Sequence, residues 1–251
     1  MGASRCRRHG DGRAGHGIQP VLGIRFWCAV ARPVGSRSLR RLDPVEVKLY
    51  GTEESVYTRI VRLVLLAKKV EFALIEADPF EGGVLPEDYD LRHPFKRIPA
   101  FEMDGVRLYE TDAIVHYVDA IIDPKLTPGD SLVAAHMRQI MRIVDNYAYA
   151  PLVWGIYVPV WWRDGLEPSD EAVGKARHVL GVIEGFLDSS PDACFNQQTL
   201  ATFYLAIVLA AADSVTQGTA LIDERLRLRE WWNGFRMTPI MTKTRSKHTK
   251  F

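Results

Sequence analysis

A proline-led hairpin constrains the fold of this chain more than any other stretch. Pro99 heads the apolar run Ala100-Phe101, where a proline is tolerated because it need not donate a hydrogen bond to a neighbouring strand. Asp104-Gly105 then separates two short alternating runs, and this pair favours the two-residue turn in which both residues adopt positive φ. The second run ends at Tyr109. The stretch therefore predicts a turn, a strand, a tight turn and a second strand.

Two polar residues follow this hairpin at the start of a helical pattern. Glu110 and Thr111 stand directly before Asp112 to Val118, where apolar residues recur at helical spacing. A carboxylate at this place binds an ammonium group, while a hydroxyl and the free helix amides bind an anion. The pair suits a ligand that carries both an ammonium and a carboxylate. An ordinary hairpin followed by a capped helix explains the same residues without a ligand.

The bulk composition is that of an ordinary globular protein. The chain has 251 residues, 47% of them hydrophobic and 25% charged, and its length fits one large or two small domains. A net charge of +1 gives no electrostatic argument for nucleic acid or a membrane as a partner. The longest apolar run of the folded part, Leu205 to Ala212, is shorter than the roughly 20 residues that span a bilayer, so it predicts a buried core helix.

The three cysteines argue against a metal or redox centre. Cys6, Cys28 and Cys194 lie far apart, form no CxxC pair and have no ligand-like spacing to the histidines. We therefore expect no disulfide framework and no metal, and we expect a reducing, cytoplasmic setting.

Residues 1–44 differ from everything that follows, because they are rich in arginine and glycine and contain few acidic residues. Three interpretations compete: a disordered basic arm, an organelle-targeting peptide, or translated sequence upstream of the true start. We favour the third, with Val45 as the initiator, because a regular domain pattern begins abruptly there.

From Val45 the patterns predict alternating strands and helices. Val45–Tyr50 alternates like a strand, Ser55 precedes a helix over 56–69, and Val70–Ile75 is a second strand, so the two strands pair in parallel. Residues 77–96 are loop-rich and hold at most a short helix. With the hairpin and its helix, the order is β-α-β-loop-β-β-α, a thioredoxin-like α/β domain over 45–122.

The second half predicts helices alone. Residues 123–130 contain two prolines and a glycine and predict a linker, and 241–251 is a basic tail. Between them lies an all-α domain over 131–240. Its expected helices are Ser131 to about Val158 with a bend at Pro151, Ser169–Leu187 capped by Ser169, Thr199–Asp213, and Asp223–Phe235.

The stretch Ile98-Pro99-Ala100-Phe101, the hairpin and the pair Glu110-Thr111 resemble the glutathione-binding half of the glutathione S-transferase family. The family has an apolar residue, a cis-proline and, eleven residues later, a Glu/Gln-Ser/Thr pair, and Pro99 and Glu110 have this spacing. The resemblance covers about residues 45–240. It implies the family's architecture, a thioredoxin-like N-terminal domain followed by an all-helical domain.

The resemblance also implies a catalytic serine. In the family's serine-type classes, such as the phi, theta or beta-like classes, a serine precedes an Arg-containing helix, and Ser55-Val56-Tyr57-Thr58-Arg59 is similar to that motif. Physically, Ser55 is an N-cap, and its hydroxyl can also donate a hydrogen bond to a bound thiolate. Lowering a thiol pKa by about two units corresponds to roughly 2.7 kcal/mol. Tyr50 and Tyr57 are rivals, but both are expected to serve packing.

Further residues are implied as glutathione contacts. Ile98 would offer its backbone to the cysteinyl unit like an added strand, next to a cis Pro99. Lys96 and Arg97 would bind the glycyl carboxylate, or they form a solvated basic loop. The aromatic residues Tyr147, Trp154, Tyr157 and Trp161 share roughly one helix face, which is core, subunit interface or electrophile pocket.

One position departs from the family pattern. The core helix commonly starts with Ser/Thr-x-x-Asp, whereas Thr199 is followed by Thr202, a weaker capping partner by about 1 kcal/mol.

The implied activity is that of a homodimeric glutathione transferase that adds the glutathione thiolate to hydrophobic electrophiles in detoxification. Glutathione is the co-substrate, and no metal, nucleic acid or membrane is involved. Two alternatives stay open: a non-catalytic glutathione-binding or scaffold protein, and a specialised dehalogenase, etherase or isomerase. The shape of the helical domain's pocket separates these, and the sequence does not show it.

Overall fold

The computed structural model describes residues 46–245 except 81, 164, 190–194 and 196–197. The chain divides into two units, Met1–Leu42 and Asp43–Phe251, and all the elements below belong to the second. The interpretations of residues 1–44 fall outside the described residues, as does most of the predicted basic tail.

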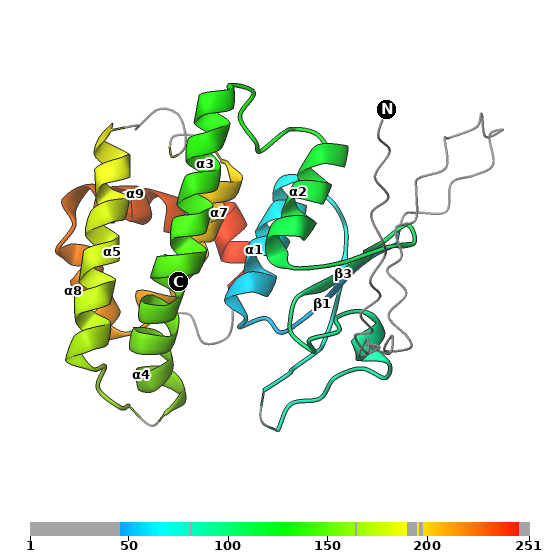
Figure 1. Ribbon diagram of the computed structural model, residues 1–251, viewed down its shortest axis with the longest axis horizontal. Helices are drawn as coiled ribbons and strands as arrows, with labels where there is room; N and C mark the ends of the chain where they lie inside the picture. Colours follow the sequence, from blue (N-terminus) through cyan, green and yellow to red (C-terminus); the bar gives the residue numbers. More distant parts are fainter. Residues whose placement is uncertain (1–45, 81, 164, 190–194, 196–197, 246–251) are drawn as a thin grey trace, which may run out of the picture. The chain divides into compact units, whose positions relative to one another are not determined.

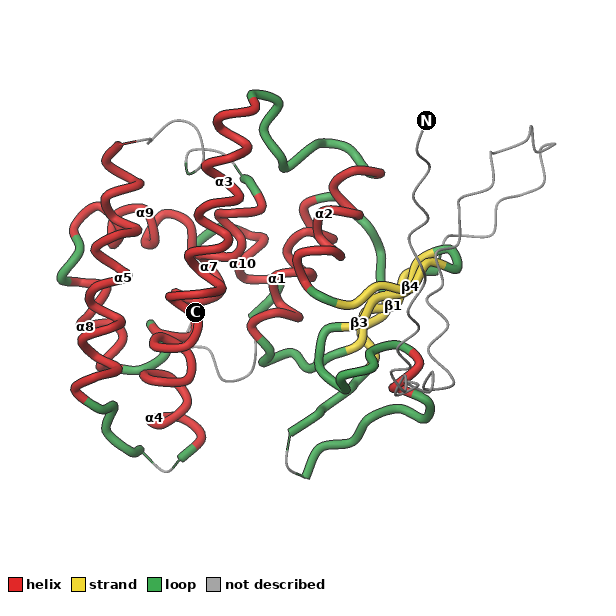
Figure 2. The backbone as a smooth tube through the Cα atoms, viewed as in Figure 1, coloured by secondary structure: helices red, strands yellow, loops and turns green. Residues whose placement is uncertain are grey.

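A four-stranded mixed sheet, drawn in yellow in Figure 2, forms the first part of the second unit. Its strand order is β2-β1-β3-β4. The strands are β1 (Val47–Tyr50), β2 (Ala73–Ile75), β3 (Ala100–Met103) and β4 (Val106–Tyr109). β1 pairs in parallel with β2 and antiparallel with β3, as the β-α-β and hairpin patterns predict. Asp104 and Gly105 have φ of 48° and 78°, which confirms the predicted tight turn.

Each face of the sheet has its own hydrophobic cluster. Val47, Leu49 and Phe101 pack with helices α1 (Val56–Ala67) and α2 (Thr111–Ile121). The opposite face holds a small cluster of Tyr50, Ala77, Tyr89 and Ala100 under the short 3-10 helix η1 (Tyr89–Leu91). Successive side chains of a strand point to opposite faces, so Leu49 and Tyr50 separate the two clusters.

A buried ion pair fastens α1 to α2 and to the chain that follows. Lys68 caps the C-terminus of α1, and its ammonium lies 2.5 Å from Asp119 of α2, with both side chains at most 5% exposed. The same ammonium donates to the carbonyl of Ile122 at 2.7 Å and to that of Pro124. Asp119 in turn accepts hydrogen bonds from the backbone N–H groups of Leu126 and Thr127. No sequence pattern indicated the burial of Lys68.

Helices make up the remainder (Figure 1). One continuous helical segment begins with α3 (Ser131–Ile143), passes through the π-helical stretches η2 (Val144–Ala148) and η3 (Ala150–Tyr157), and ends with α4 (Val158–Trp162). The elements after it are α5 (Asp170–Ser189), α7 (Leu200–Ala212), α8 (Thr216–Asp223), α9 (Leu226–Arg236) and α10 (Pro239–Lys243).

Helix α7 is the centre of this helical part, because every one of its 13 residues is buried. It contacts α1 on one side and α3, η3 and α9 on others. This confirms the core helix predicted from its apolar run. Its start carries a complete capping box: the Thr202 hydroxyl accepts from the Thr199 N–H at 2.9 Å, and Thr199 accepts from the Thr202 N–H at 3.3 Å. Thr202 therefore completes the capping box at the position where the family commonly has an aspartate, although its side chain carries no charge.

The structure adds two details to the expectations for the helical part. The predicted helix 223–235 corresponds to α9, which starts at Leu226, and the helix α8 before it was not predicted. The aromatic residues of the long segment differ in burial: Tyr147 is 65% exposed, whereas Tyr157 is 7% exposed and belongs to the core. The segment contains two π-helical stretches, and their i→i+5 hydrogen bonds change the spacing of side chains relative to an α-helix.

Candidate functional site

The strand register brings the predicted site residues to one end of the sheet. Ala100 pairs with Tyr50 at the end of β1 and with Tyr109 at the end of β4. The loop to α1, the residues before β3 and the start of α2 therefore meet. Ser55, Ile98 and Glu110 lie on these three segments.

Ser55 is the N-cap of α1. Its hydroxyl accepts a hydrogen bond from the backbone N–H of Thr58 at 3.3 Å, and its own N–H donates to the Thr52 hydroxyl at 3.2 Å. The side chain is half-buried. The hydroxyl proton is not used by this cap, because the oxygen acts as the acceptor. Ser55 can therefore cap the helix and donate to a ligand at the same time.

Glu110 and Thr111 stand at the start of α2, as predicted. Glu110 has φ 69° and ψ 116°, a conformation that costs of order 1–3 kcal/mol for a residue other than glycine. Its exposed side chain makes no capping hydrogen bond to the helix, whereas Thr111 is buried as the first helical residue. Such backbone outliers cluster at ligand sites. The carboxylate of Glu110 thus lies at the start of α2 but does not cap this helix.

The residues before β3 form the third side of the site. The Ile98-Pro99 peptide bond is cis, which confirms the prediction. The strand pairing begins only at Ala100, so the backbone of Ile98 lies beyond the ladder. Lys96 and Arg97 are both exposed, and Lys96 has φ 50°. The Tyr89 hydroxyl donates to the Arg97 carbonyl at 2.9 Å and so ties this loop to η1, a contact that no sequence pattern indicated.

A buried histidine supports the same loop. His93 is 2% exposed, and its ring lies 4.9 Å from that of Tyr109. Burial lowers its pKa, nearby Glu110 opposes this change, and Arg97 adds to it. We infer a packing role for the neutral imidazole under the end of β4.

Arg59 lies one helical turn from Ser55 and is 1% exposed. Its Nε donates to the backbone carbonyl of Thr244 at 3.1 Å, which fastens the end of the described chain to α1. Burial and the neighbouring Arg62 lower the pKa of Arg59 to about 10. The guanidinium is still charged at neutral pH and adds positive potential along this face of α1.

The two tyrosines considered as rivals to Ser55 have other contacts. The Tyr50 hydroxyl donates to Glu102 at 3.0 Å, and its ring lies under the Arg92 guanidinium. The Tyr57 ring packs against that of Tyr149 with 4.7 Å between centroids. Both tyrosines thus make contacts within the fold, and the choice of Ser55 over them as the catalytic residue remains a prediction.

An aromatic pair links the loop after β2 to the long helical segment. The rings of Phe80 and Trp154 lie 6.2 Å apart and are 54% and 44% exposed. Trp161 stacks on the buried Tyr157 at 6.4 Å. Exposed aromatic rings held in pairs offer a surface for an apolar ligand.

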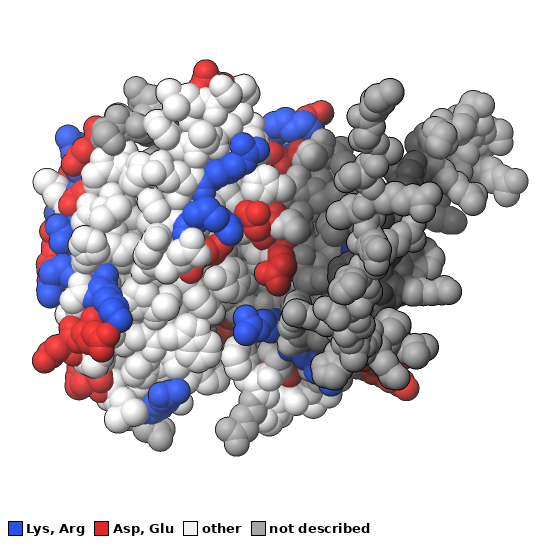
Figure 3. Space-filling model, in the orientation of Figure 1, with Lys and Arg blue, Asp and Glu red and all other residues white. Residues whose placement is uncertain are grey.

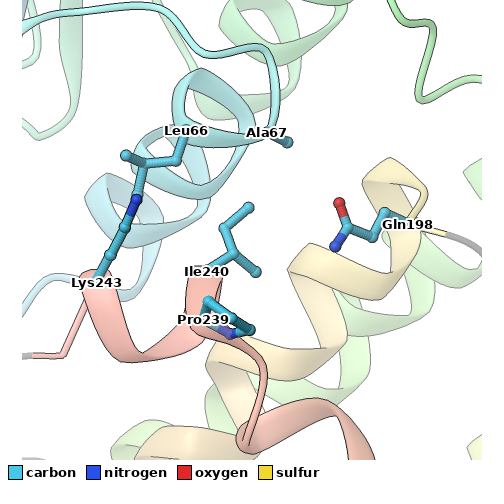
Figure 4. A pocket seen from close by; sticks show the side chains of 6 residues that line it. All are labelled: Leu66, Ala67, Gln198, Pro239, Ile240 and Lys243. Atoms are coloured by element: carbon cyan, nitrogen blue, oxygen red, sulfur yellow. The ribbon is translucent and has the colours of Figure 1, made fainter.

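Two hollows lie elsewhere. The first hollow has a volume of about 310 Å³ and lies where α2 faces α3. It is lined by Asp112, His116, Arg138 and Arg142. Figure 3 shows basic and acidic side chains gathered over this part of the surface. The other, of about 250 Å³, is near the C-terminal end of α1 (Figure 4), lined by Leu66, Ala67, Gln198, Pro239, Ile240 and Lys243. The second is at the opposite end of α1 from Ser55.

Within the described part of the chain, no cluster of three or more metal-ligating side chains occurs. No helix among those described is long and apolar enough to cross a membrane.

Comparison with known proteins identifies the family. The family model "Glutathione S-transferase, N-terminal domain" matches residues 49–125. Glutathione S-transferase F6 of Arabidopsis thaliana is 33% identical over 195 residues, which cover 74% of this chain and 92% of the relative. The chain belongs to the glutathione S-transferase family. A glutathione S-transferase of Pseudomonas putida is 30% identical over 180 residues, 70% of this chain and 80% of the relative.

Solved structures of glutathione transferases share the fold. Glutathione transferase F7 from Populus trichocarpa has a TM-score of 0.69 at 25% identity and covers 82% of this chain and 100% of its own. A maize glutathione S-transferase I, solved in complex with an atrazine glutathione conjugate, has a TM-score of 0.69 at 21% identity, with coverage of 79% and 95%. The thioredoxin-like sheet followed by helices is thus the glutathione transferase architecture, as the resemblance implied.

Proposed function

We propose that this transferase conjugates glutathione to hydrophobic electrophiles and that Ser55 stabilises the reacting thiolate. The observation that carries the proposal is the meeting of Ser55, Ile98 and the Glu110-Thr111 pair at one end of the sheet. A tripeptide with an ammonium, two carboxylates and a central thiol has a complementary group at each of these positions. The family membership supports the same activity.

The proposed role of Ser55 follows from its hydroxyl proton, which the helix cap does not use because the hydroxyl oxygen is the acceptor there. Its hydroxyl donates to the glutathione sulfur, while the amides at the start of α1 and the charge of Arg59 add positive potential. Each of these interactions favours the thiolate over the thiol, so the thiol pKa falls toward neutrality. The thiolate is the nucleophile, and it attacks the electrophile directly.

The remaining contacts hold the ends of the tripeptide. The exposed carboxylate of Glu110 binds the γ-glutamyl ammonium, and Thr111 with the first amides of α2 binds the neighbouring carboxylate. Ile98 pairs its backbone with the cysteinyl unit beside the cis Pro99. Lys96 and Arg97, both exposed on the adjoining loop, bind the glycyl carboxylate.

The electrophile takes the apolar side of the site. Phe80 and Trp154 offer aromatic faces from two different segments, and their exposure leaves them free to contact a ligand. We also propose that the protein is a homodimer in the cytoplasm, as its family resemblance implies. Sedimentation of a monomer would contradict the dimer.

The decisive experiment removes the Ser55 hydroxyl. Ser55→Ala should lower turnover of a chlorinated aromatic substrate at least tenfold and leave the affinity for glutathione similar, because the hydroxyl acts on the thiolate. Ser169→Ala is the matched control: Ser169 also caps a helix, accepting from the Ala172 N–H at 3.2 Å, but it lies outside the site. Turnover in Ser55→Ala equal to that in the control would remove Ser55 from the mechanism.

Retention on glutathione-agarose tests the binding half of the proposal. Retention of the protein with no activity across a panel of electrophiles would favour the non-catalytic alternative.

A further inference from the structure

The turn between β1 and α1 holds Ser55 by a hydrogen bond at each end of its side-chain torsion. The backbone N–H of Ser55 donates to the hydroxyl of Thr52 at 3.2 Å, and the Ser55 hydroxyl accepts from the backbone N–H of Thr58 at 3.3 Å. The first torsion of a serine side chain runs from the backbone nitrogen to the hydroxyl oxygen. Both terminal atoms of this torsion are therefore hydrogen-bonded. The turn lies where the blue ribbon of β1 leads into α1 in Figure 1.

The cap from Thr58 is too long to fix the Ser55 side chain by itself. N–H···O distances in proteins cluster around about 2.9–3.0 Å, and hydrogen bonds weaken beyond this range. A serine side chain without restraint samples the three staggered wells of its first torsion. The second bond, from the Ser55 N–H to Thr52, fixes the backbone from which this torsion starts. We therefore expect both bonds to be needed to keep the hydroxyl in one well.

The position of Thr52 is itself set by the sheet and by α1. Thr52 is 7% exposed, and the residue before it, Gly51, donates its backbone N–H to the Ile75 carbonyl of β2 at 3.0 Å. A Cβ on Gly51 would lie 2.2 Å from the Thr58 hydroxyl oxygen, so glycine lets the end of β1 come this close to α1. The acceptor of the Ser55 N–H is thus held from two sides.

We propose that Thr52 is a positioning residue that keeps the Ser55 hydroxyl in the orientation from which it donates to the glutathione sulfur. This inference rests on the proposed function, because it deepens the role given there to Ser55. Thr52 does not touch the sulfur in this scheme. It affects how strongly the thiolate is stabilised, and it leaves the contacts with the rest of glutathione unchanged.

Thr52 is neutral, so its replacement separates the orientation of Ser55 from the charges of the site. The charged and titratable groups around this turn are Arg59, Arg62, Glu53, Glu54 and Tyr157. Thr52→Val removes the acceptor hydroxyl, keeps a side chain of similar shape and alters none of these groups. A change in the pKa of the bound thiol in this variant therefore reports the orientation of Ser55.

The test measures the pKa of the thiol in bound glutathione from the ultraviolet absorbance of the thiolate. Thr52→Val should raise this pKa by about 0.5, because access to three wells lowers the occupancy of the productive well about threefold. Thr52→Ser keeps the acceptor and should retain the wild-type pKa. The Kd of S-methylglutathione, which has no thiol to ionise, should be the same in both variants as in the wild type.

A double variant distinguishes positioning from a general structural role. In the Ser55→Ala background, Thr52→Val should cause no further rise in the thiol pKa, because Thr52 acts through the Ser55 hydroxyl. Thr219→Val is the matched control. Thr219 on α8 is also partly buried, and its hydroxyl donates to Asp213 at 2.9 Å, outside the site. This control should leave the pKa of the bound thiol unchanged.

The outcomes separate this inference from the proposed function. An equal thiol pKa in the wild type and in Ser55→Ala contradicts the function given to Ser55. A pKa that rises in Ser55→Ala but not in Thr52→Val overturns the role of Thr52 alone. An equal rise from Thr52→Val with and without the Ser55 hydroxyl overturns it as well. Should Thr52→Val not fold, Thr52→Ala removes the same acceptor and decides.

Discussion

Replacing Lys68 by methionine removes the cation of the most deeply buried ion pair described here. The ammonium of Lys68 is fully buried and contacts Asp119 and the carbonyls of Ile122 and Pro124. Methionine has a similar length and fills the same space without a charge. The change therefore isolates the electrostatic part of the contact between α1, α2 and the segment after α2.

The expected loss is large because Asp119 stays behind. Breaking a buried pair from one side costs about 3–5 kcal/mol, since the remaining charge is not compensated. Asp119 keeps the N–H groups of Leu126 and Thr127 as donors, at 2.6 and 3.0 Å, which places the loss near the lower end, at about 3 kcal/mol. For a chain of this size that is a fall in Tm of about 6–12 °C.

Urea unfolding followed by circular dichroism measures this change in the free energy of unfolding. Lys175→Met is the control, because Lys175 pairs with Glu171 at 2.6 Å on the surface, with side chains 66% and 77% exposed. Such an exposed pair contributes little to stability, because water screens both charges. The double variant Lys68→Met/Asp119→Leu should lose less than the sum of its single changes, by about 2 kcal/mol.

A loss for Lys68→Met no greater than that for Lys175→Met would refute the reasoning. So would strictly additive single changes, since they would mean that Lys68 and Asp119 do not interact in the folded state.

Three more outcomes are expected. Burial opposes ionisation of Asp119, but the hydrogen bonds to its carboxylate lower its pKa overall. The stabilisation by this carboxylate is therefore present above its pKa in the unfolded chain and is lost as the pH falls through its pKa in the folded protein. Asp119→Asn should consequently make Tm depend less on pH on the acid side of a Tm-against-pH curve. Lys96 has φ 50°, so Lys96→Gly should be about 1 kcal/mol more stable to urea than Lys96→Ala, with glutathione binding weakened in both. A Cβ on Gly218 would meet the Ala212 carbonyl oxygen at 2.0 Å, so Gly218→Ala should lose about 3 kcal/mol in the same assay, whereas Gly174→Ala, with open space around it, should gain about 0.5–1 kcal/mol.

The parts of the site that follow from local chemistry were predictable from the sequence. The Asp104-Gly105 turn and the cap at Ser55 each depend on residues within a few positions of one another, whereas the cis bond before Pro99 was implied by the family resemblance alone. The family resemblance, and not the residues themselves, connected these features with glutathione binding. Their roles as glutathione contacts remain predictions.

What the sequence did not predict are pairings between distant residues. Lys68 and Asp119 are 51 positions apart, and Arg142 and Asp112 are 30 apart. Periodicity shows which face of a helix is apolar, but it does not say which charge on another helix comes opposite. The sequence left the aromatic residues of the long segment undivided among core, subunit interface and electrophile pocket, and it did not show that Tyr157 is the one in the core. The π-helical turns of this segment depart from the spacing on which a helical pattern depends.

The complete burial of α7 has a consequence for how the protein folds as it is made. Nearly four-fifths of the chain has been synthesised before Leu200 is added, and until then α1, α3 and η3 expose the apolar surfaces that α7 covers. The sheet part cannot finish folding first, since α1 completes its packing only against this late helix. Nascent chains should therefore need protection by chaperones up to that point, and a premature stop before α7 should yield an aggregating product and no stable glutathione-binding fragment.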